Sequence, residues 1–201
     1  MIPAARHHIT RLQTAILKKY TARSIARWVA ENTTYGGMPY SYKGHEYQER
    51  ILGDDSRVTN TQKCSQVGLS EANARRALAV VNVMSPYTLA YTLPTAKFAG
   101  SFMQTRIQPV IDGSDYLKSA IHKTTDNNEV KRFGDSFLWV RGAASSNAPI
   151  SIPCDHLVHD EVDFSDQETL GQYISRLTHS KWQRIDRIST QRCPILASTS
   201  I

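Results

Sequence analysis

Short alternating or apolar runs recur along the chain, separated by longer amphipathic stretches. Residues 58–63 alternate between apolar or β-branched and polar side chains, and residues 88–93 form a mostly apolar run that Pro94 ends. Patterns of this kind predict strands. The predicted strands are 58–63, 88–93, 130–132, 136–141, 156–159 and 182–188. The pair 130–132 and 136–141 flanks Gly134-Asp135 and predicts a hairpin.

Apolar residues at helical spacing predict helices before and between these strands. The predicted helices are 1–30, 45–52, 70–82, 97–110 and 166–178. Ser70 is the expected N-cap of the alanine-rich third helix. In the fourth helix, we expect Phe98, Phe102 and Ile107 to face the core.

The order of these elements predicts an α/β fold with a mostly parallel sheet flanked by helices. In such sheets, ligands bind beyond the carboxyl ends of the strands. Two polar segments follow strands directly: the loop from Lys63 to Ser70, and the pair Asp160-Glu161. Both are therefore expected on the same edge of the sheet, where a ligand would bind.

Composition limits the possible functions only moderately. The chain has 201 residues, enough for one domain with a sizeable core or two small ones, and a net charge of +6 that weakly favours a polyanionic partner. No apolar run is long enough to span a membrane. The three cysteines form no C-x-x-C pair, so a zinc site or a disulfide framework is not expected and a reducing compartment fits best. His156 and His159 have no further ligand at metal spacing.

The segment TQKCSQVGLSEA, residues 61–72, contains most of the features of a phosphate-binding loop. Gly68 would let the backbone approach a phosphate, and the Ser70 hydroxyl is placed to reach Mg²⁺. Leu69 occupies the usual lysine position, whereas Lys63 stands at the start of the loop, from which its long side chain can reach β- and γ-phosphates. The alternative interpretation is a surface lysine at a strand end followed by an ordinary turn.

The pair Asp160-Glu161 favours the phosphate-loop interpretation. In an ATPase, Asp160 would hold Mg²⁺ through water and Glu161 would orient the attacking water. The alternative is an acidic cluster at a helix N-terminus, because Asp163, Asp166 and Glu168 follow closely. A loop and a carboxylate pair in this order along the chain together favour a nucleoside triphosphatase.

With both motifs located, the chain resembles the ATPase portion of phage terminase large subunits, the motors that package double-stranded DNA into a procapsid. The resemblance covers roughly residues 28–190. One branch, which is lambda-like, carries a deviant Walker A motif with its lysine at the start of the loop, as Lys63 is here. Gln48 in HEYQ resembles the residue that reads adenine, and CDHLVHDEVDF (154–164) resembles the Walker B segment with its catalytic glutamate. Leu93-Pro94-Thr95 resembles the family's segment after the second strand, and Ser189-Thr190 resembles the start of the coupling motif.

This resemblance implies a P-loop NTPase fold of the additional-strand, catalytic-glutamate type, with ATP and Mg²⁺ as ligands. It assigns catalysis to Glu161 and Lys63, Mg²⁺ binding to Ser70 and Asp160, and coupling to Ser189 and Thr190. The implied nucleotide-binding residues are Gln48, Lys63, Gln66, Val67, Gly68, Leu69 and Ser70. The implied partners are double-stranded DNA, the portal protein and procapsid, the small terminase subunit, and further copies in a homo-oligomeric ring. The implied location is the host cytoplasm.

The chain departs from the family pattern in three respects: the arginine segment, the continuation after Thr190 and the expected absence of a nuclease domain. The family's Leu-Arg-Gly segment before the Walker B strand is replaced by residues 149–153, PISIP, so Arg141 is the substitute candidate for the trans-acting arginine finger. The expected domains are a helical segment (1–35), the ATPase domain (36–190) and an atypical tail (191–201), with a truncated C-terminus and no nuclease domain. A helicase-like ATPase and an inactive DNA-binding remnant are the alternative functions.

Overall fold

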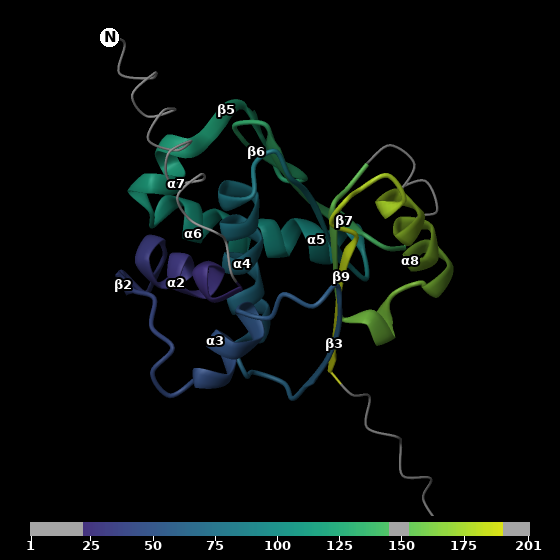
Figure 1. The fold of residues 1–201 in the computed structure, drawn as a ribbon, viewed down its shortest axis with the longest axis horizontal. Helices are drawn as coiled ribbons and strands as arrows, with labels where there is room; N and C mark the ends of the chain where they lie inside the picture. The colour runs from purple at the N-terminus through teal and green to yellow at the C-terminus, as the bar shows by residue number, and fades with distance from the viewer. Residues whose placement is uncertain (1–21, 145–152, 191–201) are drawn as a thin grey trace, which may run out of the picture.

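The computed structural model describes residues 22–144 and 153–190, and these form a central sheet with helices on both faces (Figure 1). In spatial order the strands are β3 (Val58–Lys63), β9 (Arg184–Thr190), β8 (His156–Asp160), β4 (Thr88–Leu93), β7 (Ser136–Gly142), β6 (Val130–Phe133) and β5 (Ile121–Asp126). The first five are parallel to one another. Strand β6 pairs antiparallel with β7, and β5 pairs antiparallel with β6. The predicted α/β fold with a mostly parallel sheet is confirmed.

The helices form two unequal layers. They are α2 (Ala22–Asn32), α3 (Glu46–Leu52), α4 (Leu69–Val83), α5 (Ala96–Phe102), α6 (Gln108–Asp112), α7 (Asp115–Ala120) and α8 (Gln167–Ile174). Figure 1 shows α2, α3 and α4 on one side of the sheet and α8 on the other. A small separate hairpin pairs β1 (Thr34–Tyr35) with β2 (Met38–Pro39). Within the described residues, no helix has the length and apolar character needed to cross a membrane.

The main core lies between α4 and the sheet. Most of α4 is buried, and its alanines let the helix pack closely on the central strands. Strand β8 is buried along its whole length, including its polar residues His156, His159 and Asp160. Ile25 and Val29 of α2 belong to the same core cluster as α4. A smaller cluster, which includes Leu157 and Tyr173, fills the space beneath α8.

The predicted strands are present, with small shifts of their ends: 156–159 extends to Asp160, and 182–188 becomes Arg184–Thr190. The predicted hairpin is also present. Helix α7 and strand β5 were not predicted. Strand β5 is an edge strand whose side chains are mostly exposed, so its sequence shows no apolar alternation. The N-terminal part of the predicted 1–30 helix, the loop 145–152 and the tail 191–201 lie outside the described residues.

Two helix predictions were wrong in detail. The N-cap of α4 is Gly68 in the left-handed conformation, with no side-chain cap, so Ser70 lies inside the first turn. The predicted helix 97–110 is interrupted by a π-helical turn (Met103–Ile107), and Phe98 is 61% exposed. Its buried stripe begins at Ala99, about 100° around the helix from Phe98. Phe102 and Ile107 are buried as predicted.

One buried carboxylate joins α4 to the amino-terminal halves of three strands. Asp186 of β9 accepts hydrogen bonds from Thr59 at 2.6 Å, His156 at 2.7 Å and Arg76 at 2.8 Å. Arg184 adds a further contact at 3.0 Å. Burial by itself would raise the pKa of Asp186, but its partners outweigh burial and hold that pKa well below its usual value.

We predict that Asp186→Asn destabilises the fold by about 3–5 kcal/mol at neutral pH, because it leaves two buried guanidinium groups without their counter-charge. The folded-state pKa of Asp186 is depressed, so its contribution is complete above about pH 4 and is lost as the pH falls further. Urea unfolding should therefore show a difference in the free energy of unfolding between variant and parent, and this difference should become smaller in acid. Asp135→Asn, at an exposed position, is the control. An equal loss of stability in both variants would contradict the prediction.

Candidate functional site

The loop between β3 and α4 presents backbone N–H groups at a helix N-terminus. Gln66 and Gly68 both have left-handed backbone conformations, with φ of 60° and 69°. A Cβ atom at Gly68 would lie 3.0 Å from the Gln48 side-chain nitrogen, so glycine is required by both backbone conformation and space. The first N–H groups of α4 have no partner within the helix and carry its positive dipole end. This geometry is suited to binding an anion.

Three neighbouring strands bring Lys63, Glu161 and Thr190 together beside this loop. The Lys63 Nζ atom lies 2.6 Å from Glu161 Oε1 and 3.0 Å from Thr190 Oγ1. The Thr190 backbone N–H donates to the other Glu161 oxygen at 3.3 Å. The parallel register places Lys63 directly beside Thr190, and β8 ends immediately before Glu161 on the other side of β9. The cation, the carboxylate and the hydroxyl therefore form one cluster at the carboxyl end of the sheet.

Asp160 lies behind this cluster and is almost fully buried. Its carboxylate accepts a hydrogen bond from the Tyr91 hydroxyl at 2.7 Å and one from the Glu161 backbone N–H at 3.1 Å. Burial raises the pKa of Asp160, and hydrogen bonds from Tyr91 and Ser70 and the charge of Lys63 oppose that rise. The Ser70 hydroxyl therefore lies beside the Asp160 carboxylate. Two such oxygen donors fit Mg²⁺, which prefers one or two protein oxygens and fills its other positions with water and phosphate.

Gln48 is placed against the loop by a buried hydrogen-bond pair. Its side-chain oxygen accepts from the Tyr40 hydroxyl at 2.6 Å, and its side-chain nitrogen donates to the Val67 carbonyl at 3.1 Å. Tyr47 also donates its hydroxyl to the Val67 carbonyl. In this structure, both ends of the Gln48 amide thus have partners, and the nitrogen end stabilises the loop.

The other predicted site residues lie in different surroundings. Gln66 and Val67 are in the loop itself, whereas Leu69 is buried in the main core. The Ser189 hydroxyl accepts a hydrogen bond at 3.2 Å from the backbone N–H of Asp163, which follows Glu161 by two residues in the chain. Arg141 lies on β7, which β9, β8 and β4 separate from Lys63, and it pairs with Glu129 at 3.1 Å.

Sequence reasoning missed two tyrosines that support the site. In the sequence, Tyr91 is one residue of an apolar strand, and Tyr40 is one of several aromatic residues in a loop. Each hydroxyl bonds to a predicted site residue, Asp160 and Gln48 respectively. The strand prediction places Tyr91 within β4, but no local signal indicates its partner 69 residues away. Over the described residues, no group of three or more His, Cys, Asp or Glu side chains is arranged to hold a metal.

Comparison with known proteins agrees with this fold. A family profile described as phage terminase large subunit gpA, ATPase domain, matches residues 42–196. The solved HK97 bacteriophage large terminase is similar with a TM-score of 0.73 and 10% identity, over 85% of this chain and 38% of that chain. The ATPase domain of the Thermus phage P74-26 large terminase has a TM-score of 0.59 and 14% identity, over 74% of this chain and 65% of that chain.

A further similar structure is the large terminase of a thermophilic bacteriophage, with a TM-score of 0.50 and 10% identity over 86% of this chain and 39% of that chain. No curated protein matches the chain. The structural similarities show a common fold, and the chain spans well under half the length of the HK97 protein. The profile covers most of the sequence, and the chain therefore belongs to the family of the phage terminase large subunit gpA ATPase domain.

Proposed function

We propose that this chain is the ATPase domain of a phage DNA-packaging motor, and that ATP hydrolysis takes place at the loop between β3 and α4. The observation that carries the proposal is the contact between Lys63 Nζ and Glu161 Oε1, 2.6 Å apart at the N-terminal end of α4. A lysine that offsets phosphate charge and a carboxylate that handles water are the two groups that this reaction requires. Family membership favours a packaging motor over the helicase-like alternative.

The phosphates of ATP would be bound by backbone N–H groups from Gln66 to Ser70. With the phosphates bound there, Lys63 leaves its ion pair with Glu161 and contacts the β- and γ-phosphates instead. Ser70 and Asp160 would hold Mg²⁺, which supplies positive charge to the phosphate oxygens when bound. The low exposure of the Lys63 side chain, 9%, means that its charge is poorly screened by water and acts strongly on a phosphate.

Release from Lys63 leaves the Glu161 carboxylate available to a water molecule. Glu161 then orients that water and accepts its proton as the water oxygen bonds to the γ-phosphorus and the bond to the bridging β,γ-oxygen breaks. Thr190 contacts Glu161 through its hydroxyl and its backbone N–H, and Ser189 contacts Asp163. The coupling role of Ser189 and Thr190 therefore rests on direct contact with the catalytic segment.

Two of the proposed roles require side chains to change partners. Gln48 reads adenine only if its amide exchanges the Val67 carbonyl or the Tyr40 hydroxyl for the base. Arg141 serves as an arginine finger in a neighbouring subunit only if it leaves Glu129. Both exchanges would couple ligand binding to local rearrangement.

The whole motor implies partners that this chain would meet in the host cytoplasm. We propose that it acts in a homo-oligomeric ring on double-stranded DNA, with the portal protein, the procapsid and the small terminase subunit. Family membership supports this assembly, and the net charge of +6 suits a polyanionic substrate.

Calorimetric titration with Mg²⁺-ATP, paired with a phosphate-release assay, tests the proposed site. We expect a dissociation constant below about 1 mM, the usual upper range for such substrates, and a binding enthalpy that falls sharply when Mg²⁺ is chelated. At this loop, AMP should bind far more weakly than ATP, because it lacks the phosphates that Lys63 contacts. Absence of heat with Mg²⁺-ATP in a folded preparation would contradict the proposal and leave the DNA-binding remnant as the better interpretation.

A further inference from the structure

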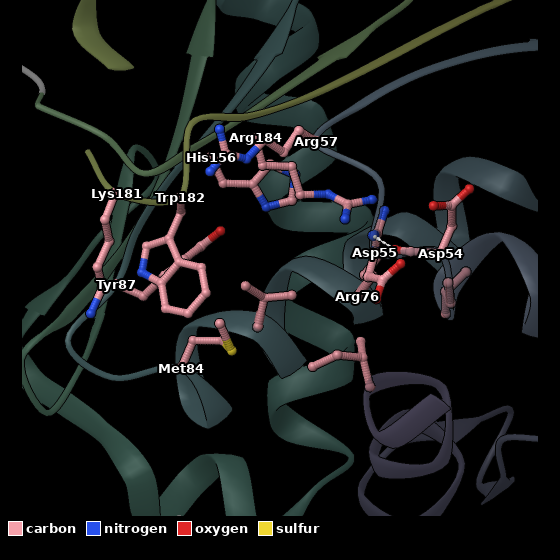
Figure 2. A pocket seen from close by; sticks show the side chains of 13 residues that line it. Asp54, Asp55, Arg57, Arg76, Met84, Tyr87, His156, Lys181, Trp182 and Arg184 are labelled. Atoms are coloured by element: carbon pink, nitrogen blue, oxygen red, sulfur yellow. Dashed lines mark hydrogen bonds between the residues drawn. The ribbon is translucent and has the colours of Figure 1, made fainter. Parts of the chain in front are cut away.

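A second cavity opens at the opposite edge of the sheet from the Lys63 loop. It has a volume of about 410 Å³ and lies where β3, β8 and β9 begin, beside the C-terminal half of α4 (Figure 2). Arg57 precedes β3, whereas Lys63 ends it, so the length of that strand separates the two sites. Pockets of this volume are typical of small-molecule sites. Parallel sheets usually bind ligands at the carboxyl edge, so a polar cavity at the amino edge needs an explanation of its own.

One wall of the cavity is aromatic. Figure 2 shows the Trp182 indole projecting into the space, with Tyr87 beside it. Their ring centroids are 6.1 Å apart in an edge-to-face arrangement, and Trp182 remains 38% exposed although it is a large apolar side chain. The buried side chains of Leu52 and Val80 add apolar surface. An exposed indole beside an apolar wall provides a face on which a flat ring can stack.

The charges around the cavity fall into two groups. Arg76 and Arg184 are fixed by the buried carboxylate of Asp186, at 2.8 and 3.0 Å. Arg57 and Lys181 are exposed, and neither has a carboxylate within ion-pair distance among residues 22–144 and 153–190. The ammonium of Lys181 lies 5.1 Å from the centre of the Trp182 ring. Among the described residues, the rim thus has two cations without an ion-pair partner.

Asp54 and Asp55 place hydrogen-bond acceptors in the same cavity. One oxygen of Asp54 accepts from the Ser56 backbone N–H at 2.7 Å, and hydrogen bonds from Ser56 lower the pKa of Asp54. Its carboxylate is therefore ionised at neutral pH. Acceptors of this kind would repel a simple aromatic acid but pair well with a ring that carries N–H or amino groups.

We propose that this cavity binds a nucleoside monophosphate unit, either as a free mononucleotide or as the terminal nucleotide of a nucleic acid. The base stacks on Trp182 and donates hydrogen bonds to the carboxylates of Asp54 and Asp55. The phosphate binds at the rim of the cavity, to Arg57 or to Lys181. A nucleotide combines the flat ring, the N–H donors and the compact anion that these three kinds of group select, and one such unit matches the cavity in size.

The test is a calorimetric titration of the full chain with GMP in EDTA, which removes the Mg²⁺ that the proposed ATP site requires. We expect measurable affinity that falls about tenfold or more in Trp182→Ala, the loss typical of removing one base–aromatic stack. The charge-reversed double variant Arg57→Glu/Lys181→Glu should lose at least as much. Guanosine and inorganic phosphate should each bind more weakly than GMP. Lys123→Glu, on the distant edge strand β5, is the control and should bind GMP like the parent.

A single-stranded hexanucleotide with a 5′-phosphate distinguishes the two sources of the ligand. Tighter binding of this oligonucleotide than of GMP, with the same loss in Trp182→Ala, assigns the cavity to the end of a nucleic acid. Equal or weaker binding assigns it to a free mononucleotide. The proposal is overturned if neither probe binds, or if GMP binding is lost in Lys63→Ala but kept in the two cavity variants. The last result would place GMP in the phosphate loop.

Discussion

Lys63→Ala is expected to reduce ATP turnover by about a hundredfold or more and to weaken Mg²⁺-ATP binding. The variant removes the one lysine that the structure places between the loop and Glu161, where it lies 2.6 Å from the carboxylate. Removal of a preorganised charge from a poorly solvated site usually costs about 10²–10³ in rate. Phosphate release at saturating ATP measures the turnover, and calorimetry measures the affinity.

Lys123→Ala is the matched control, because Lys123 is an exposed lysine on the edge strand β5 and its removal changes the net charge equally. This control should keep parental turnover and affinity. If Lys63→Ala hydrolyses ATP at the parental rate, the loop either does not bind the triphosphate or uses another cation. The first possibility would also remove the ATP-dependent heat in the parent protein, so the two are distinguishable.

The displaced lysine shows how far the sequence alone could predict this site. The order of strand, loop and helix and the position of Asp160-Glu161 were sufficient to predict which edge of the sheet brings the candidate residues together. The structure adds a reason for the unusual position of the lysine. Leu69, which occupies the usual lysine position, is 2% exposed and packs in the main core, so a charged side chain there would be buried. In the proposed site, the ammonium therefore comes from the strand end.

The contacts within the site could not be predicted, because they depend on strand order. Lys63 and Glu161 are 98 residues apart, and Lys63 and Thr190 are 127 apart. They meet only because β9 inserts between β3 and β8, which is a choice of topology that no local pattern encodes. The buried amide of Gln48 is a similar case. Its resemblance to the family's adenine-reading residue indicated a ligand contact, whereas the structure shows it bonded to Tyr40 and the loop.

Local conformation explains the remaining differences. Gly68, rather than Ser70, caps α4, since the chain enters that helix with φ of 69°, where glycine carries no steric penalty. Phe98 was expected in the core from its apolar character and is exposed because it lies at the border of the buried stripe. Periodicity thus identifies a helix more reliably than it assigns the residues at its ends.

Glu161→Gln is expected to separate binding from chemistry, which Lys63→Ala cannot do. We predict that turnover falls about 10²–10³-fold, within the range for loss of a general base. Nucleotide affinity should stay equal or become tighter, because a neutral amide no longer holds Lys63 in an ion pair and the ammonium is freer to contact phosphate. The same two measurements apply, phosphate release and calorimetry, with the exposed Glu168→Gln on α8 as the control.

The two variants together test the assignment of roles more sharply than either one alone. Loss of turnover with intact affinity in Glu161→Gln, beside loss of both in Lys63→Ala, is the pattern that a base and a phosphate-binding cation produce. Turnover within about threefold of the parent in Glu161→Gln would mean that another group orients the water. Asp160 would be a poor replacement, since it is almost fully buried and already accepts hydrogen bonds from Tyr91 and the Glu161 backbone. That outcome would therefore argue for a catalytic group supplied from outside residues 22–144 and 153–190, such as a neighbouring subunit of the proposed ring.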